Sequence, residues 1–299
     1  MIGRVAEASV PAFLADYRVE HALGYGNSGR VYLTRPPDRL GLMDELVAVK
    51  VLNGPCTDSA YERAVDELRA VSALPTPYLA RVFEAGMTDT SLYYAMEHAA
   101  LGSLAAPRRP MTWIEVVLGV SHAADAAHVM HEAGIAHAAI KPQNVLIGPH
   151  SALLSDFGLG RHLRPGLTTG VAASGSVEYL DPAVLRGGPP SRSSDVWALG
   201  ATLHRALSGV GLYGELSYTE PLSAIRTVMS SSPTLATHLA SDVAALIQAC
   251  FLPQHRRIST AAALAQQLVH LAQAAGASRP SGQHAGQRRV ICPRATHQS

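Results

Sequence analysis

The segment Ile135–Ile147 reads IAHAAIKPQNVLI, and several of its side chains carry chemistry that an apolar core segment does not need. Lys141 offers positive charge to a phosphoryl group, and Asn144 offers a neutral oxygen to a metal ion. His137 comes just before the alanine pair Ala138–Ala139, which offers no polar group. The stretch therefore predicts a loop that handles phosphate and metal but lacks a polar side chain directly after the histidine.

A carboxylate follows a short distance downstream. Residues Ala152–Leu154 are apolar and predict a strand, and the next four residues, Ser155–Gly158, read SDFG. A carboxylate at the end of a buried strand, here Asp156, can join Mg²⁺ to the phosphates of a nucleotide. The tripeptide DFG alone means little, but its place after the loop supports a site for nucleotide and metal.

A glycine-rich stretch lies near the start of the chain. Residues Gly24–Val31 read GYGNSGRV, which fits the pattern G-x-G-x-x-G-x-V. Gly24, Gly26 and Gly29 would let the backbone approach phosphates without a clash of Cβ atoms. The stretch lies between two predicted strands rather than before a helix, which disfavours a dinucleotide-binding βαβ unit.

A lysine lies on the next predicted strand, in Val47–Lys50, which reads VAVK. Lys50 follows a glycine loop and is flanked by valines, so a phosphate contact explains it better than a solvated surface position. Such a lysine needs an anionic partner, and Glu67 has the best spacing to the end of the following predicted helix. Glu62 and Asp66 remain alternatives, and simple i to i+4 surface pairing is open for all three.

The chain changes character near residue 100. The first third predicts strands broken by one helix, Ser59–Leu74, and two prolines end that helix. A strand-rich part followed by a helix-rich part predicts an α+β chain with two unlike lobes. Four helices are expected in the second part, at Trp113–Ala133, Asp195–Ser208, Asp242–Cys250 and Thr260–Ala275.

Taken in order, these motifs resemble a protein kinase domain of the Ser/Thr type, closest to the bacterial eukaryotic-like group. The resemblance covers about residues 17–275 and implies a two-lobed protein-kinase-like fold. It implies a small β-rich N-lobe with one main helix, about 17–97, and a larger α-helical C-lobe, about 100–275. Residues 276–299 are rich in Gly, Ser, Pro, Gln and Arg and contain no acidic residue, which predicts a disordered tail or linker. Further motifs that carry the resemblance are MEHA at Met96–Ala99, GSVEY at Gly175–Tyr179, DPA at Asp181–Ala183, DVWALG at Asp195–Gly200 and the pair Arg256–Arg257.

The resemblance implies that ATP or ADP binds with Mg²⁺ in the cleft between the lobes. Lys50, paired with Glu67, would hold the α- and β-phosphates, and Asn144 and Asp156 would hold the metal. The implied nucleotide-binding residues are Leu23, Gly24, Gly26, Gly29, Val31, Ala48, Lys50, Glu67, Met96, Glu97, Ala99, Lys141, Asn144, Leu146 and Asp156.

The adenine has expected contacts of its own within this set. Val31 and Ala48 are expected above the ring, and Leu146 is expected below it. The backbone of Glu97 and Ala99 is expected to hydrogen-bond the edge of the ring.

The catalytic position itself departs from the family pattern. Ala139 stands where the family carries the aspartate that accepts the proton of the substrate hydroxyl, so Lys141 remains without that base beside it. Loss of general-base help costs about 10²–10⁴-fold in rate, or roughly 3–5.5 kcal/mol. Glu178 and Asp181 are carboxylates that could stand in for the base, although nothing in the sequence places them near the transferred phosphate.

Two further positions depart from the pattern. Ala138 replaces an arginine that reads a phosphate on the activation loop, so phosphorylation is not expected to switch the domain by that route. Ala183 replaces a glutamate that pairs with a late arginine, here Arg256 or Arg257. This ion pair is therefore expected to be lost, and the substrate-docking segment is expected to be held differently.

Three explanations compete for the alanines. A natural pseudokinase is favoured because three family positions are lost together, while a weakly active kinase with a relocated base and an inactivating laboratory change are alternatives. The leading hypothesis is a nucleotide-binding pseudokinase that regulates through a protein partner. The alternatives are a weakly active Ser/Thr kinase that transfers the ATP γ-phosphate to protein, mildly supported by Ser176, and a scaffold that binds no nucleotide.

Composition limits the remaining classes. The 299 residues are 47% hydrophobic and carry a formal net charge of +1, so neither nucleic acid nor an anionic membrane is an expected partner. No run of about 20 apolar residues predicts a membrane span, and Met1–Ala15 lacks the apolar stretch of a signal peptide. Three scattered cysteines suggest a reduced, cytoplasmic location.

Overall fold

The fold was analysed in a computed structural model, which describes residues 10–26, 29–157, 159, 177–217, 220–277 and 289–290. The chain divides into two compact units. The first comprises Met1–Arg69 and Arg81–His98, and the second comprises Ala70–Ala80 and Ala99–Ser299. The first is rich in strands and the second in helices, so the predicted α+β class is confirmed. Gly158 and Ser176, which the sequence analysis used, lie outside the described residues.

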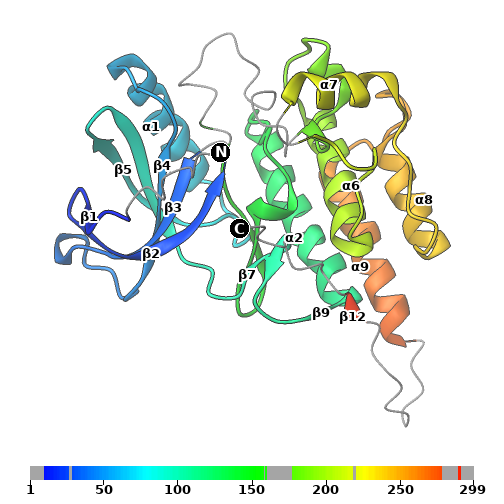
Figure 1. The fold of residues 1–299 in the computed structure, drawn as a ribbon. Helices are drawn as coiled ribbons and strands as arrows, with labels where there is room; N and C mark the ends of the chain where they lie inside the picture. The colour runs from blue at the N-terminus through cyan, green and yellow to red at the C-terminus, as the bar shows by residue number, and fades with distance from the viewer. Residues whose placement is uncertain are drawn as a thin grey trace, which may run out of the picture. The chain divides into compact units, whose positions relative to one another are not determined.

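The first unit is built on a six-stranded antiparallel sheet with the order β1-β2-β3-β4-β6-β5 (Figure 1). Every hydrogen-bonded neighbour in this sheet is antiparallel, so short connections suffice between most strands. Its elements are β1 (Phe13–Leu14), β2 (Tyr17–Gly26), β3 (Gly29–Arg35), η1 (Asp38–Leu40), β4 (Val47–Leu52), α1 (Asp58–Ser72), β5 (Val82–Thr88) and β6 (Ser91–Glu97).

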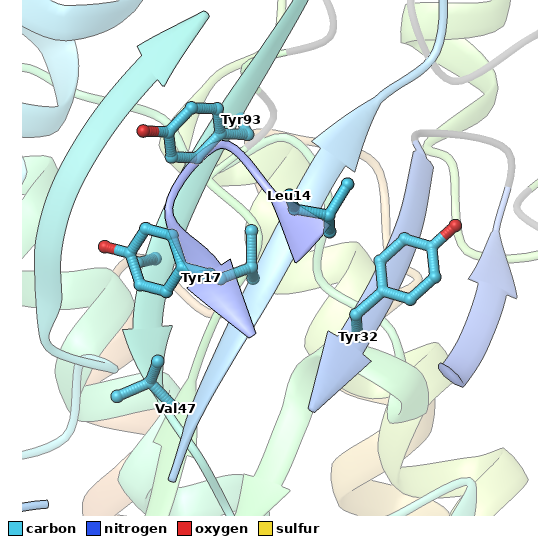
Figure 2. Close-up of a cluster of buried hydrophobic side chains, with 7 residues drawn as sticks. Leu14, Tyr17, Tyr32, Val47 and Tyr93 are labelled. Atoms are coloured by element: carbon cyan, nitrogen blue, oxygen red, sulfur yellow. The ribbon is translucent and has the colours of Figure 1, made fainter. Parts of the chain in front are cut away.

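One face of this sheet carries a cluster of buried aromatic and aliphatic side chains (Figure 2). Because side chains alternate along a strand, Val47 and Val49 of β4 lie on this face, whereas Lys50 lies on the other. The alternation thus places the candidate phosphate-binding lysine opposite the cluster. Its buried members are Leu14, Tyr17, Tyr32, Val47, Val49, Tyr93 and Ala95.

Two tyrosines of the cluster meet one carboxylate at the edge of the sheet. Figure 2 shows the hydroxyl oxygens of Tyr17 and Tyr93 on the same side, and both donate to Glu84, over 2.6 Å and 3.4 Å. Arg39 of η1 also donates to Glu84 and to Asp16. The Arg39 guanidinium and the Tyr17 hydroxyl hold the pKa of Glu84 below its ordinary value, against the effect of burial. The network joins the turn before β2 and the segment after β3 to β5.

The second unit, called the helical unit below, is organised around helices α2, α6 and α9, which contact one another. A small sheet with the order β11-β10-β7-β8 supports the functional loops beside α2. The elements are β7 (Gly102–Ser103), β8 (Ala106–Pro107), β9 (Met111–Thr112), α2 (Trp113–Glu132), η2 (Pro142–Asn144), β10 (Val145–Ile147), β11 (Ala152–Leu154), α5 (Pro182–Leu185), α6 (Arg192–Ser208), α7 (Pro221–Ser230), α8 (Ser241–Cys250), α9 (Ala261–Ala277) and β12 (Arg289–Val290).

The four helices expected in this unit are present with shifted ends. The α6 helix begins three residues before the predicted start, because Ser191 and Ser194 form a reciprocal capping box. The α7 helix was not predicted. The segment after Gly276, predicted as a tail or linker, begins inside α9 and contains Arg289–Val290, which pair with β9.

The helices of the described residues include none that is both long enough and apolar enough to cross a bilayer. The longest helix of the described residues, α2, contains Glu115 and Asp125, and its Thr112–Glu115 capping box begins it.

A buried histidine in α6 predicts how this unit responds to acid. Burial, with Arg205 and His238 nearby, lowers the pKa of His204 from 6.5 to about 4, and its Nε2 accepts the Ala236 N–H over 3.0 Å. The unfolded chain binds a proton below pH 6.5, whereas the folded chain does not until about pH 4. Stability is therefore fully present above pH 6.5 and is lost as the pH falls toward 4.

The variant His204→Gln keeps a hydrogen-bond acceptor and cannot titrate. It is expected to flatten the fall in stability between pH 6.5 and 4. Unfolding can be followed by tryptophan fluorescence, since Trp113 and Trp197 both lie in the second unit. The exposed His255→Gln is the matched control and should keep the wild-type slope. An unchanged slope in His204→Gln would assign the acid sensitivity to other groups.

Candidate functional site

The glycine-rich stretch forms the end of the β2–β3 hairpin. Gly24 pairs with Val31 and Gly26 pairs with Gly29, while residues 27–28 lie outside the described part. A Cβ added to Gly29 would lie 2.1 Å from the Val51 carbonyl oxygen, so this position requires glycine. A Cβ added to Gly24 would meet no atom within 4 Å, which leaves its backbone open for a ligand. Leu23, also in β2, is half-buried.

Lys50 lies at the centre of the sheet and is 5% exposed. Its cross-strand neighbours are Val31 on β3 and Tyr94 on β6. The next pair on the same face is Ala48 and Met96, both buried. Antiparallel pairing therefore brings Val31, Ala48, Lys50 and Met96 of the predicted site onto one face of the first unit.

Among the three candidate partners of Lys50, the structure distinguishes Glu67 by its position on α1. Glu67 is half-buried and lies along the side of the helix that buries Ala64 and Leu68. Asp66 points to solvent and pairs with Arg69 over 3.2 Å, and Glu62 is exposed. Helical spacing therefore places only Glu67 of these three on the buried side. Its direct pairing with Lys50 stays a prediction.

The segment expected to bond the adenine edge already uses part of its hydrogen-bonding capacity. The Glu97 N–H donates to the Arg81 carbonyl over 2.9 Å, and the Glu97 carboxylate accepts the Arg81 N–H over 2.9 Å. The Ala99 carbonyl accepts the Gly102 N–H over 3.1 Å. If adenine binds here, the expected contacts therefore fall on the Glu97 carbonyl and the Ala99 N–H.

A buried carboxylate from α6 holds the loop that contains the two alanines. Asp195, 1% exposed, accepts the His137 N–H over 2.7 Å and the Ala138 N–H over 2.9 Å. It also lies 2.8 Å from the His131 Nε2 of α2. The loop is thus fixed through backbone N–H groups, which any residue except proline would provide at these positions.

The loop keeps a defined backbone around the position of the missing base. Ala138 has φ +62°, a left-handed conformation that L-residues other than glycine seldom adopt. The Ala139 N–H donates to His137 Nδ1 over 3.2 Å, and the Ala139 carbonyl accepts from Asn144 Nδ2 over 2.7 Å. The half-buried Lys141 lies just before η2. The loop is therefore folded around a position that carries only a methyl group.

The two predicted metal ligands lie at adjoining strand ends of the small sheet, Asn144 just before β10 and Asp156 shortly after β11. Asn144 is buried, and because its Nδ2 donates to Ala139, its amide oxygen is the atom that can face a cation. The Asn144 carbonyl accepts both the Ser155 N–H, over 2.9 Å, and the Ser155 hydroxyl, over 3.1 Å. Asp156 comes next, buried and with φ +64°. Leu146, predicted below the adenine, is half-buried on β10 between these elements.

The donor set in this region suits magnesium better than a structural metal. Over the residues that can be described, no group of three or more His, Cys, Asp or Glu side chains could hold a metal ion by itself. Mg²⁺ is commonly bound by one or two carboxylates together with waters and nucleotide phosphates. One carboxylate at Asp156 and one amide oxygen at Asn144 fit that manner of binding.

Ala183 cannot form the ion pair that the family makes at this position, and another carboxylate holds the segment, as the sequence analysis expected when it said that the segment would be held differently. Asp181 takes the place of the missing glutamate and pairs with Arg257 over 2.5 Å, with side-chain exposures of 8% and 5%. The physical reason is that Asp181 lies just before α5, where its other oxygen accepts the Ala183 N–H over 2.8 Å. The pair is present, with the carboxylate two positions earlier in the chain.

The second carboxylate of this segment is also engaged. Glu178 is buried, accepts the Leu212 N–H over 3.0 Å and lies 3.8 Å from Arg205. Burial raises the pKa of Glu178, although Arg205 and the Leu212 N–H act in the opposite direction. Glu178 and Asp181 both have structural partners, which disfavours either of them as a replacement base.

The sequence analysis gave no site role to Asp195 or His131. Both are buried: Asp195 accepts N–H groups of the loop, and His131 contacts the Asp195 carboxylate. A usable signal was present, because Asp195 is an acidic residue followed directly by the apolar run Val196–Leu199. Buried carboxylates are rare unless they are hydrogen-bonded.

The chain is similar in sequence to several known proteins. The sequence model of the family described as Protein kinase domain matches residues 17–269. Serine/threonine-protein kinase PknJ of Mycobacterium tuberculosis is 33% identical over 213 residues, 68% of this chain and 36% of the relative. PknK of the same species is 33% identical over 253 residues, 80% of this chain and 22% of the relative. PknB of the same species is 31% identical over 215 residues, 67% of this chain and 34% of the relative. The chain thus matches 22–36% of the length of these curated relatives.

Proposed function

The chain belongs to the protein kinase domain family, and from that premise we propose that it is a nucleotide-binding pseudokinase. It binds ATP or ADP with Mg²⁺, transfers the γ-phosphate poorly, and regulates a protein partner in the cytoplasm. The observation that carries the proposal is a catalytic loop with its backbone hydrogen bonds in place and alanine at the position of the base.

Nucleotide binding is supported by the residues that each unit supplies. The first unit offers the open backbone at Gly24 and the buried Lys50, with Glu67 on the buried side of α1. The second unit offers the Asn144 amide oxygen and the Asp156 carboxylate for Mg²⁺. When bound, the metal would neutralise the charge of the β- and γ-phosphates.

Impaired transfer is supported by the chemistry of Ala139. A methyl group neither accepts the proton of a hydroxyl nor orients that hydroxyl, which lowers the rate by about 10²–10⁴-fold. The two carboxylates considered as substitutes, Glu178 and Asp181, are held in ion pairs and hydrogen bonds of the helical unit. Regulation through a protein partner is the function that remains when binding groups are present and the proton acceptor is absent.

A weakly active Ser/Thr protein kinase is the second candidate. The relatives PknJ, PknK and PknB are named as serine/threonine-protein kinases. Phosphoryl transfer also depends largely on positioning and charge neutralisation, which need no base. A scaffold without nucleotide is the third candidate, and it predicts no binding under any condition.

Calorimetric titration with ATP, with and without Mg²⁺, tests the proposal. Wild type should bind, and both Lys50→Met and Asp156→Ala should weaken binding by about 10–100-fold, since a hydrogen bond to a charged group contributes roughly 1.5–3 kcal/mol. Arg69→Met, at a solvent-exposed position on α1, is the control and should bind as wild type does.

The outcomes separate the three candidates. Binding that depends on Mg²⁺, Lys50 and Asp156 supports a nucleotide site, and transfer to protein then distinguishes the pseudokinase from the kinase. Absence of binding in every condition leaves the scaffold. Equal and tight binding of ATP and ADP, with no partner affected by either, would argue against regulation by nucleotide.

A further inference from the structure

The Arg257 side chain occupies a closely defined buried place in the helical unit. Its Nη1 donates to Asp181 Oδ2 over 2.5 Å, to the Ser193 carbonyl over 2.8 Å and to the Ser193 hydroxyl over 3.0 Å. Its Nε donates to the Leu252 carbonyl over 3.1 Å, and its guanidinium lies 5.2 Å from the centre of the Trp197 ring. The cation is thus fixed by α6 and by the segment after α8, independently of Asp181.

Asp181 connects this fixed cation to the start of α5. One carboxylate oxygen pairs with Arg257, and the other accepts the Ala183 N–H, which caps the first turn of the helix. Val184, within that turn, is buried. A single side chain therefore both begins α5 and sets where it lies on the helical unit.

We propose that Asp181 is the positioning residue of the segment Val177–Arg186, and that the Arg257 site accepts one carboxylate from either position 181 or position 183. This is the segment that the family resemblance assigns to substrate docking. In this chain the carboxylate that pairs with Arg257 lies at position 181, just before Pro182. The family carries its glutamate at the position just after the proline, here 183. The inference does not depend on nucleotide binding.

The electrostatics explain why one carboxylate is needed and a second is not. A buried arginine without a counter-charge is strongly destabilising, so Arg257 requires a carboxylate. Once Asp181 is paired, a second negative charge gains no new partner there, and position 183 is exposed. A glutamate at 183 should therefore contribute only when Asp181 is gone. The two positions are predicted to be non-additive.

A four-member series tests this: wild type, Asp181→Ala, Ala183→Glu and the double variant. Unfolding by urea, followed through tryptophan fluorescence, gives the equilibrium constant of folding for the helical unit. Asp181→Ala should lower that constant by about 100-fold or more. Ala183→Glu alone should change it by less than about threefold. The double variant should regain at least about tenfold over Asp181→Ala.

Amide hydrogen exchange separates positioning from general stability. Asp181→Asn keeps the volume and the acceptor for the Ala183 N–H but loses the charge, so it serves if Asp181→Ala does not fold. Exchange at Ala183 and Val184 should rise more than at the buried Val120 of α2. Recovery in the double variant together with this local rise supports the proposal. An equal effect of Ala183→Glu in both backgrounds, or equal exchange changes in α5 and α2, overturns it.

Discussion

Replacing Ala139 with aspartate is expected to raise phosphoryl transfer to protein by about 10²–10⁴-fold. The loop already has the fold that a base at this position needs. Asn144 donates to the Ala139 carbonyl, and Asp195 holds the two preceding N–H groups. The new carboxylate therefore enters a half-buried position on a formed backbone and requires no rearrangement of the loop.

The measurement is transfer of labelled γ-phosphate from ATP to a generic protein substrate such as casein. Ala139→Asn is the matched control, because asparagine has nearly the same shape and cannot accept the proton. Lys50→Met in the aspartate background should abolish the gain, which would tie the activity to this domain. Equal rates for the aspartate and asparagine variants would show that the base is not what the chain lacks.

Removing the carboxylate of Asp195 should give the largest loss of stability among single substitutions in the loop region. Asp195→Ala leaves three buried donors without their acceptor: the N–H groups of His137 and Ala138, and the ring of His131. Each unsatisfied buried group costs about 1–3 kcal/mol. A loss of roughly 3–5 kcal/mol in the free energy of unfolding is therefore expected.

Urea denaturation followed by tryptophan fluorescence measures this loss in the helical unit. Asp195→Asn keeps one acceptor oxygen and should lose less than Asp195→Ala. Asp242→Ala, at an exposed position in the first turn of α8, should stay within about 0.5 kcal/mol of wild type. If Asp195→Ala is no worse than this control, the loop must be held mainly by contacts other than Asp195.

The order of local motifs in the sequence was enough to predict the fold class. The β-branched run Val47–Leu52 is typical of a strand, and Gly134 and Gly209 mark the ends of α2 and α6. The α7 helix was not predicted because it is short and begins at Pro221, after a segment without clear hydrophobic periodicity. The short strands β7 and β8 exist through pairing, which a local pattern does not reveal.

The predicted site residues differ in how far sequence alone could place them. The positions of Lys50 and Gly29 lie on neighbouring strands of one sheet, so a local sequence pattern suffices to place them. The choice among Glu62, Asp66 and Glu67 needed the buried side of α1, which depends on packing. The ion pair of Asp181 joins residues 76 positions apart, and no spacing rule connects them.

The dependence of the loop on backbone contacts has a genetic consequence. Since Asp195 accepts the N–H groups of the two preceding residues, and Ala139 is bonded through its own N–H and carbonyl, the side chain at position 139 can be exchanged with little penalty to folding. The alanine codons GCT and GCC become aspartate codons when their middle nucleotide changes from C to A. Forms of this domain with efficient and with impaired phosphoryl transfer can therefore differ by a single nucleotide substitution that leaves the fold intact.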